Sequence, residues 1–139
     1  MSEISVRACR LDEVHAVLEL WKQADAIPSI TDTADDLRRA ISDSPAEVLV
    51  AEVEARIVGS IIGAFDGWRG NIYRLAVHPA SRRQGIGRAL VAEVEKRLTQ
   101  KGTRRITALV EKSHSWATSF WKAVGYGPDE RIARHVRTL

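Results

Sequence analysis

The sequence predicts a single α/β domain in which helices cover a mixed β-sheet. Two hydrophobic periods alternate along the chain: some segments repeat apolar residues at every second position, and others repeat them every 3.6 residues. Taken in order, these segments read β-α-α-β-β-β-α-β-α-β, an alternation typical of helices packed on a sheet. No internal repeat or linker interrupts the order, so residues 1–139 are expected to form one domain.

The N-terminal part predicts one strand followed by two helices. Ile4 to Arg7 alternates apolar and polar residues and is expected to be the first strand. Asp12 is expected to cap the first helix. Thr33 followed by Asp36 resembles a capping box and predicts a second, short helix that ends at Ser44-Pro45. The apolar face of the first helix is expected to carry Val14, Val17, Leu18, Trp21 and Ala24.

The central part predicts three consecutive strands. Glu47–Val53 and Arg56–Phe65 are rich in β-branched residues and are joined at Glu54-Ala55, so they are expected to form a hairpin. Asp66–Gly70 is a turn signal rich in glycine, and Ile72–Val77 is the next expected strand.

The C-terminal half predicts two helices, each followed by a strand. A long helix should begin after a glycine-containing loop and stop at Gly102, because glycine favours the left-handed conformation that ends a helix. Arg105–Val110 is strand-like, and Ser113 can cap a last helix that Gly125 ends. Arg131–Leu139 alternates weakly and is expected to be a final edge strand.

Composition places the chain among ordinary globular proteins. Hydrophobic residues make up 45% of it and charged residues 28%. No apolar run approaches the roughly 20 residues that cross a bilayer, and no secretory signal is visible, so no membrane association is expected. Cys9 is the single cysteine and is interpreted as incidental, in a reducing cytoplasm.

The charge is divided unevenly between the two halves. Residues 1–68 carry 6 Lys/Arg and 13 Asp/Glu, a net of −7, whereas residues 69–139 carry 15 Lys/Arg and 5 Asp/Glu, a net of +10. One interpretation is attraction between the halves within one domain. The other is that the basic half receives a polyanion and the acidic half attracts a cationic amine. Nucleic acid is not expected as a partner, because no basic run interleaved with aromatic residues is present.

The stretch from Leu75 to Leu98 reads as a short strand, a proline-broken turn, a basic glycine loop and a long amphipathic helix. The first N–H groups of a helix have no intrahelical partner, and glycine lets an anion approach them. Arginines at this end oppose the usual preference for acidic residues there. Together these features predict a phosphate site, although neither the G-x-G-x-x-G nor the G-x-x-x-x-G-K-[ST] fingerprint is present.

The loop Arg82-Arg83-Gln84-Gly85-Ile86-Gly87 resembles R/Q-x-x-G-x-G/A, the pyrophosphate loop of the GCN5-related N-acetyltransferase (GNAT) family. The resemblance continues through Ala108-Leu109-Val110 to Phe120–Tyr126 and covers nearly the whole chain. It is greatest to small single-domain bacterial acetyltransferases with a D-G-x-R-G loop, here Asp66–Gly70. It implies the GNAT fold, with about 6–7 strands, mostly antiparallel, flanked by about 4 helices. In that family the sheet splays between its fourth and fifth strands, where acetyl-CoA enters.

The resemblance also implies which residues contact acetyl-CoA. The strand Leu75, Ala76 and Val77 would hydrogen-bond the pantetheine arm, and backbone N–H groups near Ala76 or Val77 would polarise the thioester carbonyl. Residues Arg82, Arg83, Gln84, Gly85, Ile86, Gly87 and Arg88 would hold the pyrophosphate. The register of the last helix places His114, Trp116, Phe120 and Trp121 at cofactor positions.

The last helix departs from the family pattern at the position of a tyrosine that protonates the departing sulfur. Trp121 stands there, and an indole N–H donates a hydrogen bond but does not ionise near neutral pH. Tyr73, Tyr126 and Ser119 are alternative proton donors, with Tyr73 retained as the catalytic candidate. Packing, in the core or against the cofactor, is the favoured interpretation of Trp121.

Three residues are candidates for the general base that neutralises the amine: Asp66, Glu52 and His78. Asp66 is the first choice, with a turn residue that bonds its own loop as the alternative. Trp68, in a loop, and Trp21 are candidates for lining the acceptor site, although Trp21 also fits the core.

The sequence therefore predicts an N-acetyltransferase that moves the acetyl group of acetyl-CoA to a primary amine by direct attack in a ternary complex. The amine would be a small molecule, a protein N-terminus or a lysine. The alternative is a catalytically weak acyl-CoA-binding sensor or partner-docking module. No metal is expected, and a homodimer is left open.

Overall fold

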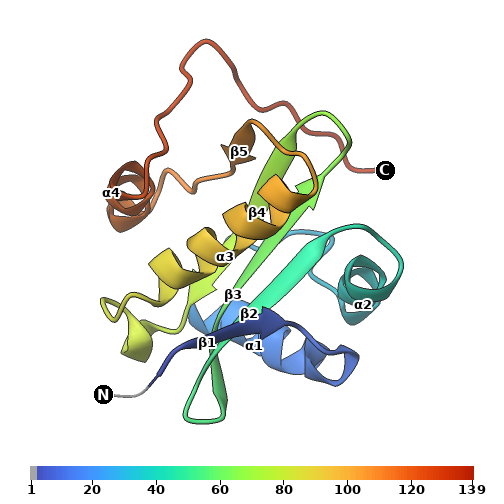
Figure 1. Cartoon of the computed structure of the whole chain (residues 1–139), viewed down its shortest axis with the longest axis vertical. Coiled ribbons are helices and arrows are strands. Elements are labelled where there is room, and N and C mark those ends of the chain that lie inside the picture. Colours follow the sequence, from blue (N-terminus) through green and yellow to red (C-terminus); the bar gives the residue numbers. More distant parts are fainter. Residues whose placement is uncertain (1–2) are drawn as a thin grey trace. The chain divides into compact units, whose positions relative to one another are not determined.

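The computed structural model describes residues 3–139, and the chain forms two compact units, residues 1–109 and residues 110–139. The first unit contains a five-stranded sheet of order β1-β2-β3-β4-β5 (Figure 1). Its elements are β1 (Ser5–Ala8), η1 (Leu11–Glu13), α1 (Val14–Gln23), α2 (Ala34–Ser42), β2 (Glu47–Val53), β3 (Arg56–Phe65), β4 (Gly70–Val77), η2 (Pro79–Ser81), α3 (Ile86–Gln100) and β5 (Ile106–Ala108). The second unit contains α4 (Ser115–Ala123).

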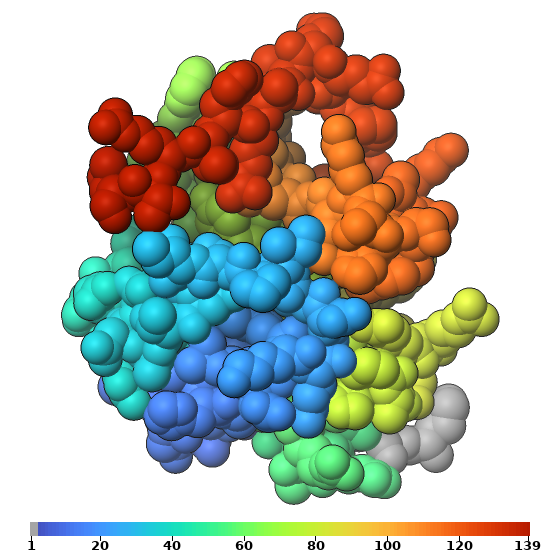
Figure 2. Space-filling model, turned by 180° about the vertical axis from the view of Figure 1, so that it is seen from behind, coloured from blue at the N-terminus to red at the C-terminus, as the bar shows by residue number. Residues whose placement is uncertain are grey.

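The predicted mixed, mostly antiparallel sheet is confirmed. Strands β1 to β4 pair antiparallel, and β5 pairs parallel to β4. Helix α3 covers one face of the sheet (Figure 1), and α1 and α2 lie on the opposite face (Figure 2). Both faces are therefore shielded, as the near-continuous apolar character of β2 and β3 requires.

The predicted strand count was too high, because Arg131–Leu139 forms no strand among the described residues. Its large apolar side chains, Ile132, Val136 and Leu139, are all exposed, and they are spaced four and three residues apart instead of two. In a strand, Ile132 and Val136 would lie on one face and Leu139 on the opposite face. The weak alternation therefore lacked the buried face that specifies a strand.

Of the three predicted helix caps, one is confirmed and two are wrong. Ser113 does not cap α4, because the N-cap residue of that helix is His114 and no described side chain bonds the cap. Thr33 caps α2 as expected: its hydroxyl oxygen accepts the Asp36 N–H at 3.1 Å and donates to the Asp36 carboxylate at 2.8 Å. Asp12 does not cap α1, because a 3₁₀ turn precedes the helix. Glu13 is the residue that fixes this start, since its carboxylate accepts the Arg10 N–H at 2.9 Å.

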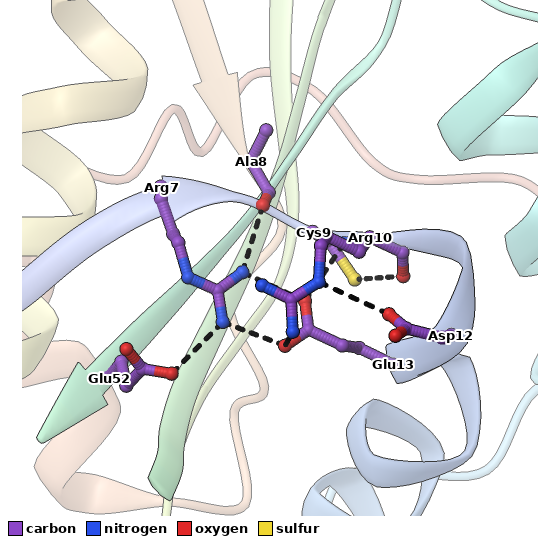
Figure 3. A network of polar contacts seen from close by, with 7 residues as sticks. All are labelled: Arg7, Ala8, Cys9, Arg10, Asp12, Glu13 and Glu52. Atoms are coloured by element: carbon purple, nitrogen blue, oxygen red, sulfur yellow. Dashed lines mark hydrogen bonds and ion pairs between the residues drawn. The ribbon is translucent and has the colours of Figure 1, made fainter. Parts of the chain in front are cut away.

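Glu13 also belongs to an ion-pair network that joins three elements (Figure 3). The Arg7 guanidinium on β1 donates to both Glu13 oxygens, at 2.8 and 2.7 Å, and to Glu52 on β2 at 3.1 Å. Glu13 is buried, and its partners lower its pKa to about 2, chiefly through the Arg7 hydrogen bond. The network therefore fastens the start of α1 to the edge of the sheet.

The predicted hairpin between β2 and β3 is confirmed. Glu54 and Ala55 form its two-residue turn with φ of 50° and 62°. Positive φ at both central residues matches the twist of antiparallel strands, and this explains why so short a loop suffices.

Helix α3 lies very close to β3, and the glycines of β3 permit this approach. A Cβ added at Gly63 would stand 2.4 Å from Val94 Cγ2, and one at Gly59 would stand 2.9 Å from Ile86 and Leu90 side-chain atoms. Ile86 and Leu90 belong to the first turns of α3. The glycines of β3 thus determine how closely α3 packs on the sheet. The N-terminus of this helix forms the predicted phosphate site.

Replacing Gly63 with alanine is expected to lower the free energy of unfolding by about 1–3 kcal/mol, because the added methyl group overpacks a rigid contact. Chemical denaturation measures this difference. Gly127→Ala is the matched control, since a Cβ there meets nothing within 4 Å. Equal stability of the two variants would contradict the close packing of α3 on β3.

The second unit contains α4 and the aromatic residues around it. The helix ends before Gly125, whose φ is 98°, as the sequence predicted. The Trp121 ring lies edge-on to Phe120, with centroids 5.5 Å apart, and to Tyr126, with centroids 5.0 Å apart. Trp121 is thus packed against neighbouring aromatic rings. Across residues 3–139, no helix has both the length and the apolar character that crossing a bilayer demands.

Candidate acetyl-CoA site

The outer edge of β4 is open along its second half. Strand β5 pairs with β4 only at Gly70, Asn71 and Ile72, and the Leu109 N–H adds a last bond to the Ile72 carbonyl at 3.2 Å. From Tyr73 to Val77, no strand among the described residues of the first unit pairs with this edge. The edge therefore presents backbone groups to a ligand, as the expected splay requires.

A β-bulge within the open segment determines which backbone groups point outward. Ser60 pairs with Ala76 but Ile62 pairs with Tyr73, so β4 contains one extra residue, and Arg74 has a φ of 53°. His78 N–H donates to the Val58 carbonyl at 2.8 Å. Because antiparallel strands alternate, the N–H of Val77 then points away from β3. Of the two expected carbonyl-polarising positions, this geometry favours Val77.

The backbone of the loop after β4 has a conformation suited to binding an anion. Arg83 and Gly85 have φ of 63° and 83°, and α3 begins at the next residue, Ile86. No side chain caps this helix, and its first turn contains no acidic residue. Its first N–H groups are therefore available, and a Cβ at Gly85 would meet nothing within 4 Å. These features fit the pyrophosphate group that the sequence predicted.

The three arginines of the loop differ in their surroundings. Arg82 is half-buried and donates to the Val77 carbonyl at 3.3 Å and to the Ala24 carbonyl at 3.2 Å. Arg83 and Arg88 are exposed, and neither has an ion-pair partner among residues 3–139. The exposed pair can therefore meet a phosphate, while Arg82 joins the end of β4 to the end of α1. Sequence reasoning missed this second role, because carbonyl partners leave no pattern in the sequence.

The cofactor candidates of the second unit lie in two contacting pairs, His114 with Trp116 and Phe120 with Trp121. The Nε2 of His114 lies 2.9 Å from the Oε2 of Glu111, and the ring centroids of His114 and Trp116 are 5.6 Å apart. Phe120 and Trp121 pack together as described above. The roles of these four residues toward acetyl-CoA stay predictions from the family resemblance.

The chain matches the acetyltransferase (GNAT) family model over residues 14–126. It belongs to the GNAT family. An acetyltransferase of Pectobacterium atrosepticum is 35% identical over 123 residues, which cover 88% of this chain and 87% of that protein. An acetyltransferase of Sodalis glossinidius is 35% identical over 129 residues, covering 93% and 91% of the two chains. The protein is thus a GNAT acetyltransferase, and the family model extends across both structural units.

Solved structures share the fold at low sequence identity. The paiA N-acetyltransferase of Thermoplasma acidophilum, in complex with coenzyme A, superposes with a TM-score of 0.82 at 19% identity and 92% coverage of both chains. An aminoglycoside N-acetyltransferase in complex with CoA gives a TM-score of 0.79 at 16% identity, covering 100% of this chain and 97% of the other. The predicted GNAT fold is confirmed.

The first-choice base, Asp66, is engaged in its own turn. Its Oδ1 accepts the N–H groups of Trp68 and Arg69, both at 2.8 Å, and these bonds lower its pKa. A general base works best with a pKa near the operating pH, so a lowered value opposes that role. The geometry favours the alternative interpretation, in which Asp66 stabilises the β3–β4 turn.

The other two candidate bases also have structural partners. Glu52 binds Arg7 in the network of Figure 3. His78 accepts the Ala80 N–H through Nδ1 at 3.1 Å. In neutral His78 the proton then resides on Nε2.

Replacing Asp66 with asparagine is expected to leave turnover within about twofold of the original, because the amide oxygen still accepts both N–H groups. Steady-state kinetics at neutral pH, with thiol release as the signal, measures this. A loss of about tenfold or more in a stable variant would instead identify Asp66 as the base.

The acceptor candidates lie in contrasting environments. Trp68 is 76% exposed, with the Arg69 guanidinium 4.5 Å from its ring centroid. Trp21 is 5% exposed, and its Nε1–H donates to the Ser60 hydroxyl at 2.9 Å, so it belongs to the core. Tyr73, the candidate acid, is 38% exposed and directly precedes the bulge at the start of the open edge.

Proposed function

We propose that this GNAT protein transfers the acetyl group of acetyl-CoA to a primary amine by direct attack in a ternary complex. The observation that carries the proposal is the continuity of two features on one unit: the open edge of β4 ends at Val77, and the anion-binding loop follows within a few residues. One can hold a pantetheine arm through backbone bonds, and the other can hold a pyrophosphate. A single acyl-CoA molecule has both groups.

The anion-binding loop and the open edge of β4 each have a role in this proposal. The N–H groups of the first turn of α3, with Arg83 and Arg88, hold the pyrophosphate. The outward N–H of Val77 donates to the acyl carbonyl oxygen and stabilises the negative charge that develops there. When bound, acetyl-CoA supplies a thioester whose thiol leaves readily, since a thiol pKa is about 8.5. Positioning of the two reactants then supplies much of the rate.

A second candidate is a catalytically weak acyl-CoA-binding sensor, and the environment of Trp121 favours it. The residue at the expected proton-donor position has no ionisable hydroxyl and packs between Phe120 and Tyr126. Tyr73 is the alternative donor in the first unit. The expected absence of a metal, the possible homodimer and the cytoplasmic location all stay predictions.

Thiol release from acetyl-CoA across a panel of amines tests the proposal. The panel should contain aminoglycosides, because similar solved structures include aminoglycoside N-acetyltransferases, together with polyamines, peptide N-termini and lysine peptides. We expect release above the protein-free rate for at least one amine. Binding of acetyl-CoA by calorimetry without release for any amine would support the sensor instead.

A further inference from the structure

The β-bulge of β4 is built around Arg74, a residue that is not glycine and yet has left-handed backbone geometry. Its φ is 53°. A side chain makes this conformation unfavourable, so the surrounding structure must hold it in place. The bulge determines that the N–H of Val77 points away from β3. The proposed contact with the acyl carbonyl depends on this direction.

The Arg74 side chain has partners that can supply this restraint. One terminal nitrogen donates to both carboxylate oxygens of Asp32, at 2.9 and 2.7 Å. The guanidinium also lies 5.3 Å from the ring centroid of Trp21, whose position is fixed by its bond to Ser60. The side chains of Arg74 and Asp32 are only 16% and 21% exposed, so water weakens this ion pair less than it weakens a surface pair.

Asp32 belongs to the segment between α1 and α2 and is itself held there. Its N–H donates to the Ser29 carbonyl at 3.0 Å, and its Oδ2 accepts the Ser29 N–H at 3.0 Å. At the other end of this segment, Arg82 binds the Ala24 carbonyl. Arg74 and Arg82 therefore bind the two ends of the α1–α2 segment. Arg74 lies near the first residue of the open edge, and Arg82 bonds its last residue, Val77.

We propose that Arg74 and Asp32 are a positioning pair that keeps the β4 bulge left-handed and so directs the N–H of Val77 toward the bound acyl-CoA. The pair also links the α1–α2 segment to this backbone geometry. Neither side chain takes part in the chemistry. The link to acyl-CoA rests on the proposed function, whereas the effect on the backbone does not.

Two measurements on the intact protein test the pair: ¹H–¹⁵N NMR shifts of the amides of residues 74–77, and acetyl-CoA affinity by calorimetry. In Asp32→Asn we expect these amides to shift and affinity to fall about tenfold. Asp35→Asn is the matched control, because Asp35 forms an exposed pair with Arg38 on α2. The control should leave both measurements unchanged.

Substitution of Arg74 separates positioning from general stabilisation. Arg74→Ala should weaken acetyl-CoA binding as much as Asp32→Asn does, whereas Arg74→Gly should restore most of the affinity, since glycine adopts positive φ without strain. Asp32→Asn should have no further effect in the Arg74→Gly background.

Lower melting temperatures for Asp32→Asn and Arg74→Ala, with unmoved amides at 74–77 and unchanged affinity, would overturn the proposal and leave a merely structural pair. If the original protein does not bind acetyl-CoA, the proposed function fails, and the amide shifts alone decide whether the pair positions the bulge.

Discussion

Replacing Gly85 with aspartate is expected to weaken acetyl-CoA binding at least about 100-fold, or about 2.7 kcal/mol. Gly85 has a φ of 83°, and the space beyond its Cα is open. An added carboxylate would occupy the position proposed for the pyrophosphate and repel it. Two unit charges about 4 Å apart near a protein surface interact by about 4 kcal/mol, so repulsion alone accounts for the loss. Calorimetric titration with acetyl-CoA measures it.

Gly67→Asp is the matched control for this variant. Gly67 also has a positive φ, of 97°, and a Cβ there also meets nothing within 4 Å. Both variants therefore carry a similar backbone strain and the same added charge, but Gly67 lies in the β3–β4 turn. If both variants are folded by circular dichroism and bind acetyl-CoA with equal affinity, the Gly85 loop is not part of the cofactor site.

Replacing Glu13 with glutamine is expected to destabilise the protein by about 1.5–3 kcal/mol, because it removes the charge that Arg7 pairs with in this half-buried network and leaves Arg7 with Glu52 alone as its ionic partner. Glu13 holds Arg7 through both carboxylate oxygens and fixes the start of α1 (Figure 3). Urea denaturation at pH 7 measures the change. Asp12→Asn is the control, because its pair with Arg10 is exposed, and we expect about 0–1 kcal/mol there.

The pH dependence of unfolding provides a second measure of the same carboxylate. The pKa of Glu13 falls from 4.5 to about 2 in the folded protein. A lowered pKa stabilises the fold above the unfolded value, so this contribution is complete above about pH 4.5 and is lost as the pH falls toward 2. Stability should thus fall less between pH 5 and 2 in Glu13→Gln than in the original protein. Parallel pH profiles would contradict the role of the network.

The features that the sequence predicted well are those with a local cause. The Glu54-Ala55 turn, the Thr33 cap and the glycine ends of α3 and α4 follow from propensity and capping within a few residues. The anion loop could be predicted because glycine is a poor helix former and arginine opposes the dipole at a helix start, whereas both residues favour a bound anion there.

The features that escaped prediction depend on contacts between distant segments. Arg74 reaches Asp32, 42 residues away, and Arg82 reaches Ala24, 58 residues away. No spacing rule connects such residues. The terminal segment Arg131–Leu139 was wrongly predicted as a strand because alternation was weighed without knowing which face would be buried. Glu13 replaced Asp12 at the start of α1 because the Arg7 ion pair outweighs local capping.

A crystal structure of the protein with acetyl-CoA would decide whether the open edge of β4 and the loop before α3 hold one cofactor molecule. We predict density for the pyrophosphate at the N–H groups that open α3, beside Arg83 and Arg88. We also predict the pantetheine arm along Tyr73–Val77, with the acyl oxygen within hydrogen-bonding distance of the Val77 N–H. Acetyl-CoA bound elsewhere, or bound at the loop with its arm directed away from β4, would contradict this assignment.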